Sequence, residues 1–454
     1  MRYIYFHIDE LNRDAIVASV LGSELKKYGW KVIYGNRFLS RLLKHFEWIF
    51  DAIILPKPLF ISAIFNENQI NKLKSKYVML YTENIGIVAD DTHPKMLLRC
   101  ALDPDFMSGK NDSVEKVSAF CFWGEQVANV VRNSYPPLKN KCYVVGHPRH
   151  DKRAIGKNSP NNKSYHKKSV GIITRFVAIN DYYERNPIAD LVNRFLNDDI
   201  LYEYKNQAND DFLINEKRGS RPDHDLFLEI IDIKIIIKII KRLKADGYNV
   251  SIKIHPRENP DTWRKIDSFL HLDIDIVDPQ LPFSSWAVEQ NCVIGPPSTS
   301  FYDCFMLGIT PISIANIDPE RQRFVSKYFE ENNKLMEHVI APYNIDDLLD
   351  NIRQIESNDF FMSADIENIL YKEANFPLCS KSIEALGSVV KRILETEPDR
   401  TLSQFFGLYF YNFFRSAYTL LGVLRNFLLR RKITSSNFLL TPITARKIKI
   451  MGNF

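Results

Sequence analysis

Hydrophobic and polar positions along the first 150 residues follow two periods in turn, and this pattern predicts strands alternating with helices. Residues 3–8 form an apolar run that is typical of a buried strand, and residues 14–28 have the 3.6-residue period of a helix. Further short buried strands are expected at residues 31–34, 52–55, 77–81, 119–122 and 142–145. This order predicts a parallel sheet with helices on both faces.

A second strand–helix series follows a break in the pattern. Residues 151–169 are polar and rich in Lys, Asn and Ser, which indicates a linker between domains. Strands are then expected at 170–174, 250–254, 274–277, 293–294 and 311–314, and helices at 227–244, 344–355 and 380–395. The predicted organisation is an N-terminal domain over 1–150, a linker over 151–169 and a C-terminal domain over 170–395.

The C-terminal segment, residues 396–454, has a different pattern. Residues 402–429 are rich in Phe, Tyr and Leu, but Arg415 and Arg425 would each cost about 2.5–3.5 kcal/mol near the centre of a bilayer. Polar residues fall roughly along one side of the expected helix. The segment therefore predicts an amphipathic helix lying in the interface of an anionic membrane, and the alternative is a helix that packs over the N-terminal domain.

Charge supports this separation of the tail from the body. The chain of 454 residues has a net charge of +5. Residues 401–454 contain no Asp or Glu and eight basic residues, namely Arg415, Arg425, Arg430, Arg431, Lys432, Arg446, Lys447 and Lys449. Removing them from 60 basic and 55 acidic residues leaves 52 against 55, or −3, for residues 1–400. A near-neutral body argues against a nucleic-acid partner.

Two turns in the second series have the chemistry of a phosphate site. The strand ending at Ile254 is followed by His255, Pro256 and Arg257, and the strand ending at Gly295 is followed by the hydroxyl-rich run Ser298, Thr299 and Ser300. In open parallel sheets, ligands bind beyond the carboxyl ends of the strands, where helix N-termini present free N–H groups. The pattern predicts a nucleotide-phosphate site at this edge.

Several motifs resemble bacterial surface-carbohydrate (capsule or lipopolysaccharide) biosynthesis proteins. Gly146-His-Pro-Arg-His-Asp151 is similar to the family's Gly-Asn-Pro-Arg-Phe-Asp signature, and Cys121-Phe-Trp-Gly-Glu125 is similar to the Cys-Trp-Gly-Glu run before it. The block from Phe227 through His255 to Trp263, and the segment 295–313, match in order and spacing. The resemblance covers about residues 1–390.

The resemblance implies an α/β protein of GT-B fold, with two Rossmann-like domains facing across a cleft. It also implies a metal-independent glycosyltransferase similar to the transferases of Kdo and sialic-acid type, which use CMP-activated ulosonic acids and carry a His-Pro motif. The family's acidic-acidic-Gly motif has its nearest counterpart in Glu83-Asn84-Ile85-Gly86, where Asn84 replaces the second carboxylate and Ile85 separates it from the glycine.

On the donor side, His255 is expected to give a hydrogen bond or positive charge to the leaving phosphate, with Pro256 fixing the exit of the chain. The alternative for His255 is a capping histidine whose imidazole is satisfied by loop backbone. Gly295, Ser298, Thr299 and Ser300 are expected near the donor, although one hydroxyl must cap the helix in any case. Arg257 is either a phosphate ligand or a solvated side chain.

On the acceptor side, Glu83 is the candidate general base, with a loop or helix-capping acid as the alternative. Asp223 and Asp225 are candidate catalytic carboxylates or ordinary caps of the helix expected at Phe227. Arg149 and Asp151 are expected to contact ligand or to form an ion pair at the hinge.

No metal is expected, because Asp273-Ile-Asp275 reads as the solvated side of an alternating strand over residues 271–278. Six scattered cysteines and the direct opening on a strand predict a cytoplasmic protein without disulfides.

These expectations converge on a cytoplasmic, peripheral membrane glycosyltransferase that uses no cofactor. Its partners would be a CMP-linked sugar donor, a lipid-linked oligosaccharide acceptor and the inner face of the cytoplasmic membrane. Two alternatives stay open: a transferase that uses CDP-glycerol or a UDP, GDP or dTDP sugar, and a non-catalytic scaffold or glycan-binding subunit of a polysaccharide assembly complex.

Overall fold

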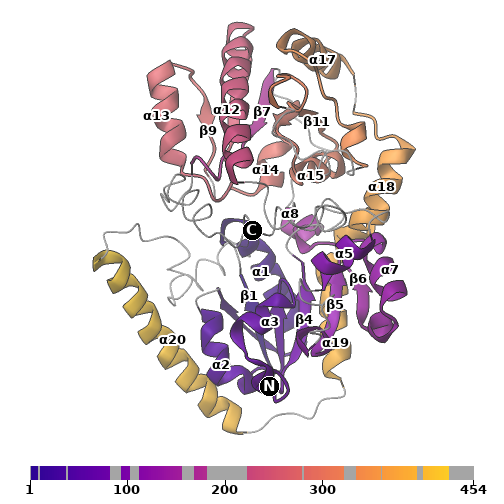
Figure 1. The fold of residues 1–454 in the computed structure, drawn as a ribbon, viewed down its shortest axis with the longest axis vertical. Helices are drawn as coiled ribbons and strands as arrows, with labels where there is room; N and C mark the ends of the chain where they lie inside the picture. The colour runs from indigo at the N-terminus through magenta and orange to yellow at the C-terminus, as the bar shows by residue number, and fades with distance from the viewer. Residues whose placement is uncertain are drawn as a thin grey trace, which may run out of the picture. The chain divides into compact units, whose positions relative to one another are not determined.

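The computed structural model describes residues 2–8, 11–36, 39–81, 94–102, 112–155, 168–180, 222–278, 281–321, 334–358, 360–395 and 402–428. The chain forms two compact α/β units (Figure 1). The first contains Met1–Lys157 and Asn368–Phe454, and the second contains Asn158–Glu367. Two α/β units with parallel sheets confirm the predicted fold class.

The first unit is built on a six-stranded sheet in the order β2-β1-β3-β4-β5-β6, with every pair parallel. Its strands are β1 (Tyr3–His7), β2 (Lys31–Gly35), β3 (Ala52–Leu55), β4 (Lys76–Leu80), β5 (Val117–Phe122) and β6 (Cys142–Val144). The helices from the N-terminal part of the chain are α1 (Leu11–Lys26), α2 (Leu43–Phe46), α3 (Leu59–Ile64), α4 (Glu67–Ile70), α5 (Pro94–Ala101), α6 (Asp112–Glu115), α7 (Glu125–Ser134) and α8 (Lys152–Ile155). Short 3-10 turns are η1 (Leu39–Leu42), η2 (Glu47–Ile49), η5 (Pro136–Lys141) and η6 (Pro148–His150).

The second unit has a five-stranded parallel sheet in the order β11-β10-β7-β8-β9. Its strands are β7 (Ser169–Ile173), β8 (Asn249–Lys253), β9 (Asp275–Ile276), β10 (Cys292–Gly295) and β11 (Thr310–Ser313). Its helices are α12 (Pro222–Ala245), α13 (Pro260–Leu270), α14 (Phe283–Ala287), α15 (Ser300–Met306) and α17 (Ile345–Ser357), with the 3-10 turn η9 (Met336–His338).

The two faces of the second sheet differ in their cover. One face forms the main core against α12 and α17, with Ile252 and Ile294 among its buried residues. On the other face, Trp286 of α14 donates a 2.9 Å hydrogen bond from Nε1 to Ser251 Oγ. Gly171 leaves room for that ring, because a Cβ there would lie 2.8 Å from Trp286. The alternation along β7 and β8 thus matches the two-residue period of a strand.

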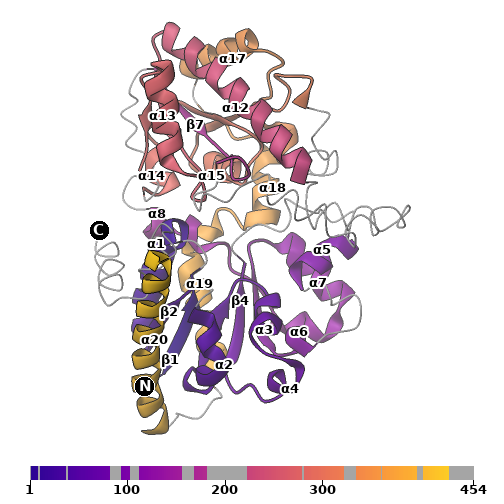
Figure 2. The same cartoon turned by 60° about the vertical axis from the view of Figure 1, so that its left-hand side comes forward.

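After the second unit, the chain returns to the first, and this part of the predicted domain division is wrong. The returning segment is α18 (Ala364–Ala374), the 3-10 turn η10 (Leu378–Lys381) and α19 (Ser382–Leu394). Buried residues of α19, including Ile383, Leu386 and Val390, lie in one core with α1 and the first sheet, as the position of α19 in Figure 2 also shows. The predicted C-terminal domain of 170–395 therefore loses its last helix to the N-terminal unit. The period of 380–395 predicted the helix but not which sheet it would cover.

The tail helix α20 (Leu402–Leu428) packs on the first unit beside α2. Gln404 is buried and donates a 2.8 Å hydrogen bond from Nε2 to the Ile49 carbonyl. Tyr411 is fully buried, and its ring meets the edges of Phe46 and Phe50. A Cβ on Gly407 would lie 2.6 Å from Trp48. On this side, α20 therefore packs over the N-terminal unit, which is the alternative that the sequence left open.

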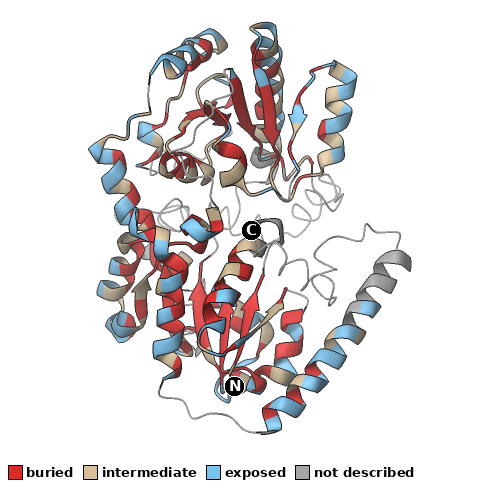
Figure 3. Cartoon of the chain, turned by 180° about the vertical axis from the view of Figure 1, so that it is seen from behind, coloured by how far each residue is buried: buried red, intermediate tan, exposed pale blue. Residues whose placement is uncertain are grey.

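The opposite side of α20 is apolar and exposed. We call Phe405, Phe406, Tyr409, Phe410 and Phe413 the aromatic face of α20. Each of them is 55–73% exposed. Figure 3 shows that exposed positions recur along this helix. Among the helices that the structure describes, none is long and apolar enough to cross a membrane. The residues beyond 428 fall outside the described ranges.

Candidate functional site

Three loops meet at the carboxyl edge of the second sheet. Because β10, β7 and β8 are neighbours and run parallel, the segments that follow them emerge side by side. The His255 turn follows β8, and the Gly295–Ser300 segment follows β10, so the structure brings the two predicted motifs to one edge. The third loop, residues 174–180 after β7, lies between them and was not recognised in the sequence.

The strand order also fixes where a ligand fits on this edge. The chain proceeds from β7 to β8 and β9 on one side and returns with β10 on the other side of β7. The order therefore reverses between β7 and β10. In open α/β sheets such a switch point leaves a crevice that binds ligands.

The His255 turn holds its imidazole in one tautomer. The backbone N–H of Arg257 donates to His255 Nδ1 at 3.2 Å. A backbone N–H can only donate, so Nδ1 is the acceptor and the ring proton lies on Nε2. Pro256 between them fixes the backbone at the end of the strand. The partly buried imidazole therefore has its N–H on Nε2, and its expected bond to the donor phosphate stays a prediction.

Glu258 connects the His255 turn to the loop after β7. Its buried carboxylate accepts from Thr174 Oγ1 at 2.7 Å, from the Phe176 backbone at 3.0 Å and from Trp263 Nε1 at 3.1 Å. The His255 backbone N–H also donates to it, at 3.3 Å. Burial raises the pKa of Glu258 in spite of these bonds. Four donors from three segments make Glu258 the residue that positions this edge, a role that the sequence analysis did not assign.

Two more ionisable groups support the same edge. Glu229 of α12 accepts from the backbone N–H groups of Ala178 and Ile179 at 2.8 and 2.9 Å. Burial raises the pKa of Glu229 to about 7. Burial also lowers the pKa of Lys253, the last residue of β8, to about 8. The Lys253 ammonium donates to the carbonyls of Asp278 and Leu281. Both ionisable side chains therefore form hydrogen bonds with backbone groups at this edge.

The three hydroxyl residues that follow β10 differ in their contacts. Ser298 Oγ accepts from the Ser300 backbone N–H at 3.2 Å, while Thr299 makes no side-chain cap bond. Close packing requires a glycine at position 295, because a Cβ on Gly295 would lie 2.3 Å from Ile173 Cγ1. The start of α15 thus uses one hydroxyl for its turn and leaves Thr299 and Ser300, both partly buried, for another role.

The three predicted catalytic carboxylates have different outcomes. Glu83 lies outside the described residues. Asp223 and Asp225 lie inside the first turn of α12, because this helix begins at Pro222 rather than near Phe227; their side chains are not described. Asp223 and Asp225 therefore do not precede the helix as predicted, and first-turn acids favour a helix in any case.

The Asp-x-Asp pair does not lie in a long alternating strand. Strand β9 contains only Asp275–Ile276, and Asp273 has a left-handed φ of 53°. Asp273 is exposed and pairs with Lys244 at 2.8 Å, whereas Asp275 accepts from Ser251 Oγ at 3.1 Å. The predicted strand over 271–278 is wrong because His271 and Asp273 both turn the backbone. Within the described ranges, no three His, Cys, Asp or Glu side chains gather as metal ligands do.

A second His-Pro-Arg turn follows β6 in the first unit. The Arg149 backbone N–H donates to His147 Nδ1 at 3.1 Å, so this imidazole also keeps its proton on Nε2. The Arg149 guanidinium lies 4.6 Å from the ring centroid of Trp123, and its Nε donates to His150. The residues His147-Pro-Arg149 and His255-Pro-Arg257 thus build the same turn on the two sheets. The repeat is visible in the sequence and was missed there.

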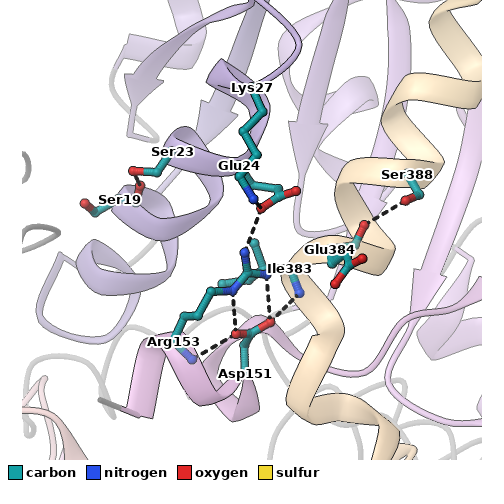
Figure 4. A network of polar contacts seen from close by, with 9 residues as sticks. All are labelled: Ser19, Ser23, Glu24, Lys27, Asp151, Arg153, Ile383, Glu384 and Ser388. Atoms are coloured by element: carbon teal, nitrogen blue, oxygen red, sulfur yellow. Dashed lines mark hydrogen bonds and ion pairs between the residues drawn. The ribbon is translucent and has the colours of Figure 1, made fainter. Parts of the chain in front are cut away.

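Asp151 is a structural residue of the first unit. Its fully buried carboxylate accepts from Arg153 Nε at 3.0 Å and from the Ile383 backbone at the start of α19 at 2.9 Å (Figure 4). Arg153 in turn pairs with Glu24 of α1 at 2.6 Å. The ion pair expected at Arg149 and Asp151 is therefore made by Arg153 instead. Asp151 ties α8, α1 and α19 together.

The glycines of the two family-like motifs allow the returning segment to pack closely against the first unit. A Cβ on Gly124 would lie 2.2 Å from the Lys372 carbonyl of α18. Gly146 has a φ of 72°, and a Cβ there would lie 2.7 Å from Cys379 Cβ. Ser382 Oγ also donates to the His147 carbonyl. The motifs at Trp123-Gly124 and Gly146–Asp151 are therefore where the returning segment α18–α19 is held.

Comparison with known proteins agrees with this architecture. Residues 221–314, from α12 through the His255 turn to β11, match the family model of α-2,8-polysialyltransferase. A variant of the wall teichoic acid polymerase TagF superposes with a TM-score of 0.50 at 12% identity, over 87% of this chain and 90% of that one. The Staphylococcus aureus protein MnaA with UDP gives a TM-score of 0.43 at 10% identity, over 88% and 99% of the two chains. A search of curated protein sequences gave no match.

The family match and the fold lead to one coarse conclusion. The matched segment contains all the donor-side residues that were predicted, from His255 to Ser300. The similarity to TagF supports the fold, which has two parallel-sheet units. The chain is a glycosyltransferase of GT-B architecture, and the family match supports a place for it in surface-carbohydrate biosynthesis.

Proposed function

We propose that this glycosyltransferase transfers a sialic-acid-like ulosonic acid from a CMP donor to a lipid-linked glycan. The observation that carries the proposal is the carboxyl edge of the second sheet, where the Nε2–H of His255 and the loops after β7 and β10 adjoin a switch point. The family match to polysialyltransferase spans the same residues and favours a sialic-type sugar.

Each donor-side residue has a role in the proposal. His255 donates a hydrogen bond from Nε2 to the phosphate oxygen that leaves, which stabilises the charge that develops there. Arg257, Thr299 and Ser300 supply further donors to phosphate or ribose. Glu83, Asp223 and Asp225 stay predictions for the carboxylates of the reaction. The reaction needs no metal or cofactor in this scheme.

Nucleotide binding tests the donor. We expect CMP or CDP to raise the unfolding temperature of the full chain, because a ligand at about 100 times its Kd adds about 2.7 kcal/mol of stability. Differential scanning fluorimetry with CMP, CDP, UDP, GDP and dTDP at equal concentration measures this. Stabilisation by UDP, GDP or dTDP alone would contradict the CMP donor and favour the other sugar nucleotides. Silence across all five would favour the non-catalytic scaffold.

We further propose that the aromatic face of α20 binds an anionic lipid surface. The inner side of the helix is already occupied through Gln404 and Tyr411, so the five exposed aromatic rings point away from the unit that holds them. Exposed apolar patches of this kind mark interaction sites. The eight basic residues of 401–454, with no acid among them, favour anionic lipid as the occupant. Such attachment would bring the enzyme to a lipid-linked acceptor.

Replacing Phe406, Phe410 and Phe413 by serine is expected to abolish flotation with vesicles that contain phosphatidylglycerol. The rings partition into the headgroup region, whereas serine does not. The matched control is Phe269→Ser with Phe361→Ser, since both of these rings are 82% exposed on the second unit. The control should float like the unchanged chain. Equal flotation of the triple variant would refute the lipid face, and a lipid-free change from dimer to monomer would assign the face to a second copy instead.

A further inference from the structure

The loop after β7, residues 174–180, carries one charged side chain, the exposed cation of Arg175. Arg175 follows Thr174, which is the first residue beyond β7. Since β7 lies between β8 and β10 in the sheet, Arg175 emerges at the carboxyl edge beside the switch point. Among the described residues, no carboxylate forms an ion pair with its guanidinium. The loop therefore places a positive charge at the edge where the ligand is expected.

Glu258 fixes the backbone on both sides of Arg175. Its Oε1 accepts from Thr174 Oγ1 at 2.7 Å and from the Phe176 backbone N–H at 3.0 Å. The Phe176 ring is fully buried, and its centroid lies 5.9 Å from that of Trp263. The side chains before and after Arg175 thus point into the unit, and that of Arg175 is the one that reaches solvent.

Glu229 of α12 fixes the second half of the same loop. Its Oε1 accepts from the Ala178 backbone N–H at 3.0 Å, and its Oε2 accepts from Ala178 and Ile179 at 2.8 and 2.9 Å. The loop ends at Asn180, whose Nδ2 donates to the Asn259 carbonyl at 3.1 Å. Two carboxylates from different elements therefore hold one loop, and all of these residues belong to the second unit.

We propose that Arg175 binds the phosphate of the nucleotide donor and that Glu229 is the positioning residue for its loop. The proposal rests on the transferase function above and adds two residues to the donor site. A guanidinium presents several N–H groups in one plane, which match the oxygens of a phosphate. Because both halves of the loop are already held, donor binding does not have to order it, and this lowers the entropic cost of binding.

The charge of Glu229 makes this arrangement depend on pH. Burial raises the pKa of Glu229 to about 7 in spite of its backbone hydrogen bonds; the charge of Glu258 also raises it, and that of Arg175 lowers it. An ionised carboxylate accepts hydrogen bonds more strongly than the neutral acid, so the loop is held best above pH 7. The folded chain binds this proton more tightly than the unfolded chain, so ionised Glu229 costs stability above pH 7. Glu229→Gln should therefore leave the unfolding temperature at pH 8 no lower than that of the unchanged chain.

Calorimetric titration of the full chain with CMP tests Arg175. Arg175→Gln is expected to raise the Kd about 10–100-fold at pH 8, because a charge-assisted hydrogen bond to phosphate is lost. Arg175→Lys keeps the charge but not the planar donors, so its Kd should fall between the two. The matched control is Arg264→Gln, an exposed arginine of α13 that pairs with Asp261 and should bind CMP normally.

Equal CMP affinity of Arg175→Gln and the unchanged chain would overturn this role and leave the proposed function standing. If the unchanged chain binds no CMP, the proposed function fails, and the role of Arg175 fails with it.

The positioning role of Glu229 predicts a dependence on pH. Glu229→Gln should raise the Kd for CMP about fivefold at pH 8 and less than about twofold at pH 6, where Glu229 is already protonated. The phosphate of CMP titrates in this range for both chains, so the difference between them at each pH reports Glu229. Hydrogen exchange of the peptide that contains 174–180, measured without nucleotide, should be faster in the variant at pH 8. Glu289→Gln, at an exposed position of the same unit, should change neither quantity. An equal loss of affinity at both pH values, or unchanged exchange, would overturn the positioning role.

Discussion

His255→Asn is expected to lower kcat by about 10²–10³-fold without unfolding the second unit. The loss is that of one preorganised donor to a developing negative charge. The asparagine carbonyl can still accept from the Arg257 backbone N–H, because Asn forms the same kind of two-residue turn. The substitution therefore removes Nε2–H alone, and the KM for the donor should change less than kcat.

Steady-state transfer and the unfolding temperature measure this outcome together. His271→Asn is the matched control, since His271 is exposed and has a left-handed φ of 50° that asparagine accepts readily. The control should keep full activity. If His255→Asn retains kcat within about threefold, the imidazole serves only the turn and the assigned role fails.

Leu386→Ala is expected to destabilise the first unit by about 2–5 kcal/mol. Leu386 is fully buried in the core that α19 shares with α1 and the first sheet, so truncation leaves a cavity. The effect should be confined to the unit that contains β1–β6. The sequence-based division at 395 predicts the opposite location, in the unit that contains the donor edge.

Hydrogen exchange resolved along the chain distinguishes the two locations. Protection should fall in β1, β3 and β4, while β7, β8 and β10 keep theirs. Leu378→Ala is the control, because Leu378 is 61% exposed in the same returning segment. Loss of protection in the second sheet instead would restore the predicted boundary.

Local patterns predicted most of the elements of this fold. The alternation of periods predicted both sheets, and the carboxyl-end rule predicted that His255 and Ser298 lie on one edge. The sequence pattern does not predict which sheet a buried helix face packs against. The period of residues 380–395 shows that a face is buried, but an apolar stripe fits either sheet equally well. Only three-dimensional packing assigns α19 to the first unit.

The candidate site divides in the same way. His255 stands out because a proline and a strand end surround it in the sequence. Glu258 does not, because two of its four donors, Thr174 and the Phe176 backbone, lie 84 and 82 residues away in the chain. Residues defined by their partners, rather than by their neighbours in the chain, escape sequence patterns.

The return of α18–α19 to the first sheet has a consequence for synthesis on the ribosome. Residues 158–367 separate the two parts of the first unit. At about 5–20 residues per second, roughly 10–40 s pass between the emergence of these parts. Until α19 arrives, the apolar side chains that it covers, such as Val78 and Cys121, lack their cover. The unit that is translated first is thus the one that finishes folding last, and nascent chains shorter than about 394 residues are expected to depend on chaperones.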